Sequence, residues 1–410
     1  MVPNPASQAV VVDAFVKVGS RHEPERINGI SHFLEHLNFK GTRNYGTAKL
    51  LSEAIDSVGG VMNANTGKEH TQYYAQVESR HIVLAFDVVT ELFRYPLFKP
   101  NEIAKEKGVI VEEINMYLDN PQHHILDMLE EAMWHKHSLG RNIAGTPAHV
   151  RAISKKDITD YRQTHYSPGN TIVAVAGNFN GKEVKMLVNK YWLDYGGQAV
   201  GPAPALAAGA EQLPLVMQRK QTNQAHFALG FKSYPRDDER NYALNVLSAV
   251  LAGGMSGRLF TEVREKRGLA YYVDAEAGNY QDTGTFVVRA GVEIGKIDMS
   301  LEVVLRELAK MRRNLLTLKE IRKAKEYLKG RVALSLESTG SKMAWFLDQL
   351  AFSKKIEEPN EWMEKIDKVT PPEVRKAANE VIKKETATLA VIGPYSDKDE
   401  SSFEGIMAKL

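Results

Sequence analysis

The segment Gln8-Ala-Val-Val-Val-Asp-Ala-Phe15 has a counterpart 216 positions later (224 − 8), Gln224-Ala-His-Phe-Ala-Leu-Gly-Phe231. Both segments are predominantly apolar and bounded by polar residues, which predicts a buried strand in each half of the chain. A second pair stands at an offset of 218 (316 − 98), because residues 98–106 (FKPNEIAKE) are echoed by residues 316–324 (LTLKEIRKA). The two offsets nearly coincide, so the sequence predicts an internal repeat of two homologous domains.

Each half continues with a strand-rich middle and then long amphipathic helices. Alternating segments over residues 71–77 and 285–292 predict strands, and the apolar spacing over residues 300–312 predicts a helix. This order of elements predicts an α+β fold of two homologous α/β domains. In each domain we expect a mixed, largely antiparallel sheet packed by helices.

The expected domains are residues 1–196 and residues 213–410. Residues 197–212 between them are rich in Gly, Pro and Ala, which is typical of a linker. A chain of 410 residues is long enough for two or three domains of ordinary size.

A helix expected after the first strand carries His32-Phe-Leu-Glu35-His36. At about 100° per residue, His32 and His36 lie one turn apart and can hold one ion, with Glu35 beside them. Neutral imidazoles suit Zn²⁺, which in catalytic sites takes three protein ligands, and a neighbouring carboxylate can take a proton from the attacking water. The order H-x-x-E-H is that of the inverted zincins. Taken alone, the five residues also fit a surface helix with two polar histidines.

A third ligand must come from another helix, and residues 106–115 offer the best candidate. Glu106 and Glu113 are seven positions apart (113 − 106), so on a helix they share one face to within about 20°, whereas Glu112 lies about 120° from Glu106. This spacing predicts Glu113 as the third ligand and Glu106 as a supporting or proton-handling carboxylate. Two carboxylates on one inward face need a partner charge, which a divalent ion supplies.

The internal repeat separates a catalytic interpretation of these residues from a structural one. All five candidates are absent from the second copy, where their counterparts are Ser248, Leu251, Ala252, Ala324 and Arg331. A purely structural role predicts no such coordinated loss. The first half is therefore predicted to hold the metal, and the second half is predicted to close over the substrate.

These motifs resemble a known family. His32 to His36, followed by Phe39-Lys-Gly-Thr42 and by Glu113 seventy-seven positions after His36 (113 − 36), is similar to the M16 metallopeptidases. That family includes pitrilysin, insulysin and the mitochondrial processing peptidase, and the chain length resembles its short bacterial processing-protease branch (M16B-like). Further matches run over nearly the whole chain: Asn63–Thr66, Glu69–Tyr74, Leu139–Arg141, Gly145–Thr146, Tyr166–Asn170 and Arg264–Tyr271.

The resemblance implies a zinc metalloendopeptidase in which His32, His36 and Glu113 hold Zn²⁺. Glu35 is then the general base that also protonates the leaving amine, and Glu106 supports the ligand helix and shares protons. The resemblance further implies that the two halves form a clamshell around a chamber that admits unfolded peptides or presequence-like segments. Family members usually have an additional strand ahead of the segment at which this chain begins, so we expect a shortened strand there.

Four further residues match family positions that contact the substrate. Asn63 and Ala64 match an edge strand that captures an extended peptide through main-chain hydrogen bonds, and an ordinary solvent-facing edge is the alternative. Arg264 and Tyr271 match a pair that binds the substrate backbone and stabilises the tetrahedral intermediate. The alternative is that Arg264 pairs with a neighbouring carboxylate and Tyr271 serves in packing.

Composition narrows the classes of function. The formal net charge of +2 gives no reason to expect nucleic acid or an acidic membrane as a partner, and the absence of cysteine excludes disulfides and a thiol nucleophile. There is no apolar stretch of about 18 residues and no signal-peptide pattern, so a cytoplasmic location is expected. The expected partners are peptides and a second subunit, in a homodimer or a heterodimer with a related M16 chain. The alternative function is a peptide-binding subunit, either non-catalytic or dependent on a partner chain for activity.

Overall fold

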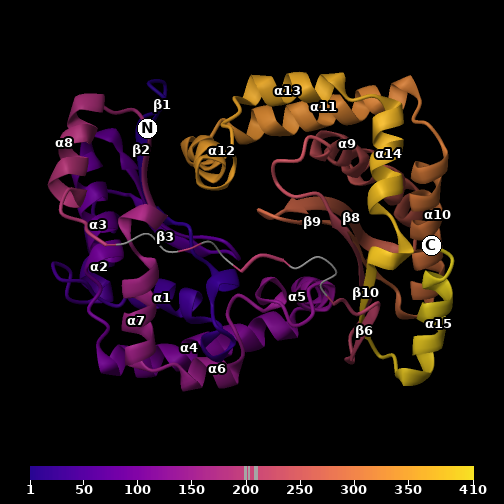
Figure 1. Ribbon diagram of the computed structural model, residues 1–410, viewed down its shortest axis with the longest axis horizontal. Coiled ribbons are helices and arrows are strands. Elements are labelled where there is room, and N and C mark those ends of the chain that lie inside the picture. Colours follow the sequence, from indigo (N-terminus) through magenta and orange to yellow (C-terminus); the bar gives the residue numbers. More distant parts are fainter. Residues whose placement is uncertain (198–200, 202–203, 207–210) are drawn as a thin grey trace. The chain divides into compact units, whose positions relative to one another are not determined.

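The computed structural model describes residues 1–197, 201, 204–206 and 211–410, and its strands form two five-stranded sheets (Figure 1). In spatial order, the first sheet is β1 (Val2–Pro3), β5 (Thr171–Gly177), β2 (Ala9–Val16), β4 (Thr71–Glu78) and β3 (Val61–Thr66). The second sheet is β6 (Leu215–Arg219), β10 (Ala387–Gly393), β7 (Ala225–Ser233), β9 (Gly284–Val292) and β8 (Ala270–Asn279).

The two sheets have the same connectivity, strand for strand. β1 runs parallel to β5 and β6 runs parallel to β10, whereas the other neighbours in both sheets are antiparallel. The repeated segments of the sequence form β2 and β7, the central strands. The prediction of two homologous α/β domains with mixed, largely antiparallel sheets is therefore confirmed. β1 has two residues where its counterpart β6 has five.

The chain divides into two compact units that do not follow the sequence in one cut. The first unit comprises residues 1–116, 141–205 and 335–351, and the second comprises residues 117–140, 206–334 and 352–410. This division differs from the predicted bounds of 1–196 and 213–410 in two segments, since each half of the chain contributes one segment to the other unit. The predicted linker, residues 197–212, lies largely outside the described residues.

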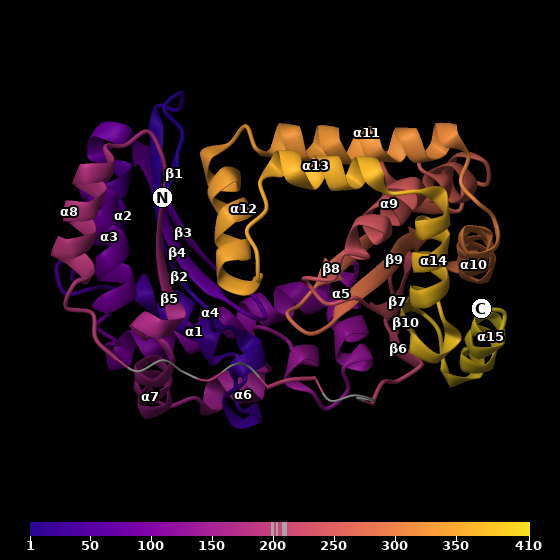
Figure 2. The same ribbon diagram turned by 45° about the horizontal axis from the view of Figure 1, so that its top comes forward.

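In the first unit, helices cover the sheet in layers. They are α1 (Ile30–Asn38), α2 (Ala48–Asp56), α3 (Ile82–Arg94), most of α4 (Pro100–Asp119), α6 (Pro147–Ala152), α7 (Lys155–His165), α8 (Gly181–Trp192) and most of α12 (Thr339–Phe352). α3 packs on β2 and β4, and α8 packs on α3, as Figure 2 shows. Alternate residues of β2, from Val10 to Val16, enter this core because successive side chains of a strand point to opposite faces.

The second unit has helices on both faces of its sheet. They are α5 (Pro121–Met133), α9 (Asn241–Ala252), α10 (Ile297–Arg313), most of α11 (Leu318–Ser335), α13 (Pro359–Lys368), α14 (Pro371–Val381) and α15 (Asp397–Met407). α9 packs on β8, whereas α5 packs on β7 and β10 through a cluster that includes Leu129 and Met133. The approach is close, because a Cβ at Gly230 of β7 would lie 2.6 Å from the Met133 sulfur. The buried apolar face of α5 is the physical reason why residues 117–140 belong to this unit.

None of the helices in the described part of the chain combines the length and the apolar character that crossing a membrane requires.

Candidate metal centre

The helix α1 presents two different faces. Its buried apolar residues recur at helical spacing: Ile30, Phe33, Leu34 and Leu37. Because one turn takes about 3.6 residues, this spacing leaves His32, Glu35 and His36 together on the opposite face. Packing of the apolar face thus fixes the rotation of the helix and presents the H-x-x-E-H residues away from the core.

A buried carboxylate holds the start of this helix. Glu23 accepts hydrogen bonds from the backbone N–H of Gly29 at 2.7 Å and of Ser31 at 2.8 Å, and from the Asn28 side-chain amide at 2.9 Å. Gly29 stands at the N-cap position with φ of 95° and has no side chain with which to cap the helix. Glu23 therefore satisfies amides that the first turn leaves without partners, immediately before the first histidine.

Gly29 cannot be replaced by a larger residue without disturbing this start. We expect Gly29→Ala to lower the free energy of unfolding by about 3 kcal/mol or more, because positive φ disfavours alanine and a buried backbone clash adds to that cost. A Cβ there would lie 2.4 Å from the carbonyl oxygen of Ala144. Urea unfolding measures the change. Gly46→Ala is the matched control, because nothing lies within 4 Å of a Cβ at that position; equal stability of both variants would contradict the prediction.

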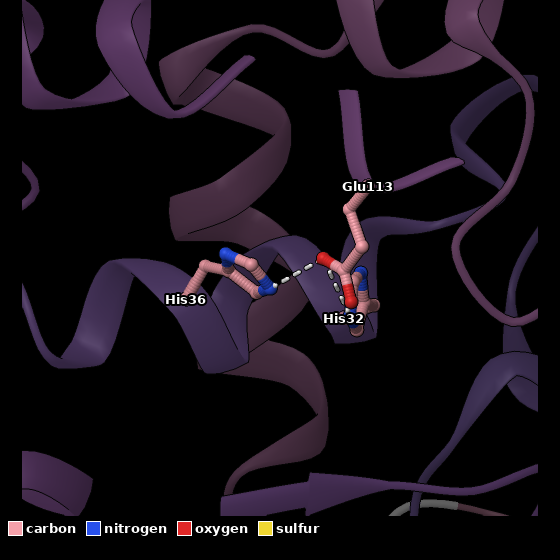
Figure 3. A group of neighbouring side chains, drawn as sticks. All are labelled: His32, His36 and Glu113. Carbon is pink, nitrogen blue, oxygen red and sulfur yellow. Dashed lines mark ion pairs between the residues drawn. The ribbon is translucent and has the colours of Figure 1, made fainter. Parts of the chain in front are cut away.

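The helix α4 brings a carboxylate to the two histidines (Figure 3). Glu113 Oε2 lies 3.2 Å from His36 Nε2 and 3.7 Å from His32 Nε2. One ligand atom from each of the three residues lies within 4.8 Å of the others, and no second such group occurs among the described residues. Glu112 is exposed, as its predicted position on the helix requires. The structure therefore brings together the three residues that the sequence predicts as metal ligands.

The helix α4 also supplies a buried carboxylate to the far side of one imidazole. Glu106 is 3% exposed and lies 2.9 Å from His36 Nδ1 through Oε1 and 2.9 Å from Lys40 Nζ through Oε2. Glu106 and Glu113 share a face of α4, as predicted, but contact opposite nitrogens of the same ring. Glu106 is therefore placed to orient His36 rather than to bind the ion.

The carboxylate of Glu35 is held by the end of β3. Thr66 donates its hydroxyl to Glu35 Oε2 at 2.5 Å. Burial raises the pKa of Glu35 above its usual range, and the hydrogen bond from Thr66 offsets part of that rise. A half-buried carboxylate beside two histidines, with one oxygen fixed, has the position expected of a general base.

The two histidines have opposite electrostatic environments. Burial lowers the pKa of His32 to about 4, and the neighbouring His36 contributes to that lowering. For His36, burial also lowers the pKa, but hydrogen bonds to Glu106 and Glu113 outweigh burial and raise the pKa to about 9. The cluster thus combines a neutral imidazole, a second imidazole with a carboxylate on either side, and the charge needed to bind a cation.

The donor set fits a divalent transition metal. Two imidazoles and one carboxylate are the protein ligands of many catalytic zinc sites, which leave a further position for water. The side chains of His32, His36 and Glu113 are 13%, 20% and 23% exposed, so the cluster is partly buried and still open to a small molecule. These residues suit Zn²⁺ in kind, number and proximity.

The four predicted substrate contacts lie on separate elements. Asn63 and Ala64 lie on β3, which is an edge strand as predicted, and Asn63 Oδ1 accepts a hydrogen bond from the Ala64 amide. In the second unit, Arg264 lies in the π-helical turn η6 (Phe260–Glu265), with its guanidinium 4.9 Å from the Phe260 ring. Tyr271 follows in β8 and is 61% exposed. Their contacts with a substrate stay predictions.

Comparison with known proteins assigns the two halves of the chain to a common family. The family model described as insulinase (peptidase family M16) matches residues 1–147, and the model described as peptidase M16 inactive domain matches residues 152–328. An uncharacterized zinc protease of Bacillus subtilis, YmxG, is 40% identical over 341 residues, covering 83% of this chain and 82% of that protein. An uncharacterized zinc protease of Streptomyces coelicolor is 36% identical over 411 residues, covering 98% of this chain and 89% of that protein.

Solved structures show the same architecture. A protease from Helicobacter pylori matches with a TM-score of 0.89 and 25% identity, covering 96% of each chain. A Pseudomonas fluorescens protein titled peptidase M16 inactive domain matches with a TM-score of 0.87 and 18% identity, covering 96% of this chain and 95% of that one. The fold is thus the two-domain α/β fold of M16 proteases. Together with the relatives, it shows that this chain belongs to peptidase family M16, as its motifs predict.

Proposed function

We propose that this chain is a zinc-dependent endopeptidase that hydrolyses unfolded peptides or presequence-like segments. The observation that carries the proposal is the convergence of His32, His36 and Glu113 within 4.8 Å, next to Glu35 on the same helix face. The names of the relatives as zinc proteases support zinc as the metal. The match of residues 152–328 to an inactive M16 domain supports catalysis by the first half alone.

The side chains around the cluster have distinct chemical roles in this proposal. When bound by His32, His36 and Glu113, zinc supplies Lewis-acid polarisation of the scissile carbonyl and lowers the pKa of the attacking water. Glu35 takes a proton from that water at Oε1, because Thr66 occupies Oε2, and then gives the proton to the leaving amine.

The position of Thr66 also suggests where a peptide lies. Thr66 is the last residue of β3, and the far edge of β3 pairs with no strand among the described residues. A peptide added to this edge would run about 4.8 Å from β3, through main-chain hydrogen bonds that do not depend on side-chain identity. Asn63 and Ala64 would then line the peptide on its way to Glu35. Such addition requires an extended chain, which excludes folded proteins as substrates.

The remaining predictions extend this proposal. Arg264 and Tyr271 are proposed to contact the peptide backbone from the second unit, and their exposure is compatible with that role. Pairing with a second subunit and a cytoplasmic location also stay predictions.

Metal removal tests the proposed function. We expect the zinc-loaded chain to hydrolyse a quenched, unstructured peptide library, and the chelator-treated chain to lose at least about 10²-fold of that rate, because the metal supplies the electrophile. Addition of zinc is expected to restore activity, and a stably folded protein offered in parallel is expected to stay intact. A zinc-loaded chain that binds the peptides without cutting them would instead identify a peptide-binding subunit.

A further inference from the structure

Lys40 contacts the metal site indirectly, through Glu106. It lies four residues after His36, just past the end of α1, and its side chain is 30% exposed. Its ammonium contacts Glu106 Oε2 at 2.9 Å, while Oε1 of the same carboxylate contacts His36 Nδ1 at 2.9 Å. The two oxygens of one buried carboxylate therefore have one partner each, and these partners lie one helical turn apart.

The Glu106 contact is the one that orients an imidazole of the histidine pair. His32 Nδ1 is buried and has no hydrogen-bond partner among the described residues. When His36 Nδ1–H donates to Glu106, the lone pair stays on Nε2, the nitrogen that faces Glu113. The direction of the Glu106 carboxylate thus sets both the tautomer and the ring orientation of His36.

Lys40 restrains that direction. A carboxylate held by one partner can rotate about its last side-chain bond, and this terminal torsion has a broad distribution. A second contact, from a cation to the other oxygen, fixes the plane of the group and compensates the cost of burying its charge. α1 positions Lys40 for this task because residues four apart on a helix lie on the same side.

We propose that Lys40 is a positioning residue for metal binding: it fixes the Glu106 carboxylate so that His36 presents Nε2 to the ion. This inference rests on the proposed function, because it assigns a role toward the zinc that His32, His36 and Glu113 would bind. It adds a residue to the site that neither binds the metal nor contacts a substrate.

The test measures zinc affinity of the full chain by competition with a chromophoric chelator. Lys40→Met is expected to raise the zinc dissociation constant about tenfold, since loss of groups that orient ligands typically costs 10- to 100-fold. Lys40→Arg keeps a cation within reach of Glu106 and is expected to stay within about threefold of the unmodified chain. In a Glu106→Gln background, Lys40→Met is expected to add less than about twofold, because two residues that act through one contact are not additive.

Two controls separate positioning from folding and from the proposed function. Lys99→Met removes a similarly half-buried lysine, whose ammonium donates to the Gly46 carbonyl at 2.6 Å, and is expected to leave zinc affinity unchanged. Unchanged affinity in Lys40→Met, or an equal loss with and without Glu106, would overturn the inference while the unmodified chain still binds zinc and cuts peptide. If the unmodified chain binds no zinc, the proposed function fails as well.

Discussion

Replacement of Glu35 by glutamine is expected to lower kcat/KM for peptide hydrolysis by about 10³-fold, because general acid–base catalysis contributes typically 10² to 10⁴. The substituted side chain would keep the length of Glu35 and an oxygen that can accept the Thr66 hydroxyl, so the local structure should persist. An amide, however, cannot take a proton from water. Zinc content should stay the same, because Glu35 is not one of the three grouped ligands.

The measurement is peptide hydrolysis at saturating zinc, with the metal content of each variant determined on the same sample. Glu53→Gln is the control, because Glu53 is an exposed residue of α2 that pairs with Lys49. Substantial activity in Glu35→Gln would assign the base to another residue. Loss of zinc in that variant would place Glu35 among the ligands.

The strands and long helices could be predicted because they depend on local periodicity. The central strands, the internal repeat and the helices that carry the site all follow from spacings that the sequence shows directly. The grouping of α5 could not be predicted in this way. Its apolar residues Ile125, Leu129 and Met133 recur every four positions, which indicates one buried face, but no local pattern states which sheet covers that face. Its sequence neighbours in α4 belong to the first unit, whereas its packing partners β7 and β10 come much later in the chain.

The candidate site divides in the same manner. Residues that share a regular helix could be related by angle alone, which singled out His32 and His36 on one helix and Glu113 on another before any coordinates. Thr66 and Glu23 come from a strand end and a short helical turn, so no periodic spacing relates them to α1. Lys40 left a signal, because it stands one turn after His36 as His36 stands one turn after His32. That spacing acquires meaning only once the buried face of α4 places Glu106 between the two side chains.

Removal of the Glu113 carboxylate is expected to weaken zinc binding by about 10²- to 10³-fold, because a binding free energy of roughly 10–16 kcal/mol in a four-ligand zinc site corresponds to several kcal/mol per ligand. Glu113→Gln retains the shape of the side chain but leaves a neutral amide at the place where the carboxylate oxygen lies 3.2 Å from His36 Nε2. An amide oxygen is a poor zinc ligand in a site whose other two protein ligands are neutral imidazoles.

The adjacent Glu112 provides a matched control for this prediction. It is exposed on the same helix, so Glu112→Gln changes the net charge equally without touching the cluster. Chelator competition should give unchanged zinc affinity for Glu112→Gln and the large loss for Glu113→Gln, with similar urea midpoints for both. Equal effects would show that the chain's overall charge, rather than a bond from Glu113, governs metal binding. Retained affinity in Glu113→Gln would require a different third ligand, which the described residues do not offer within the same 4.8 Å.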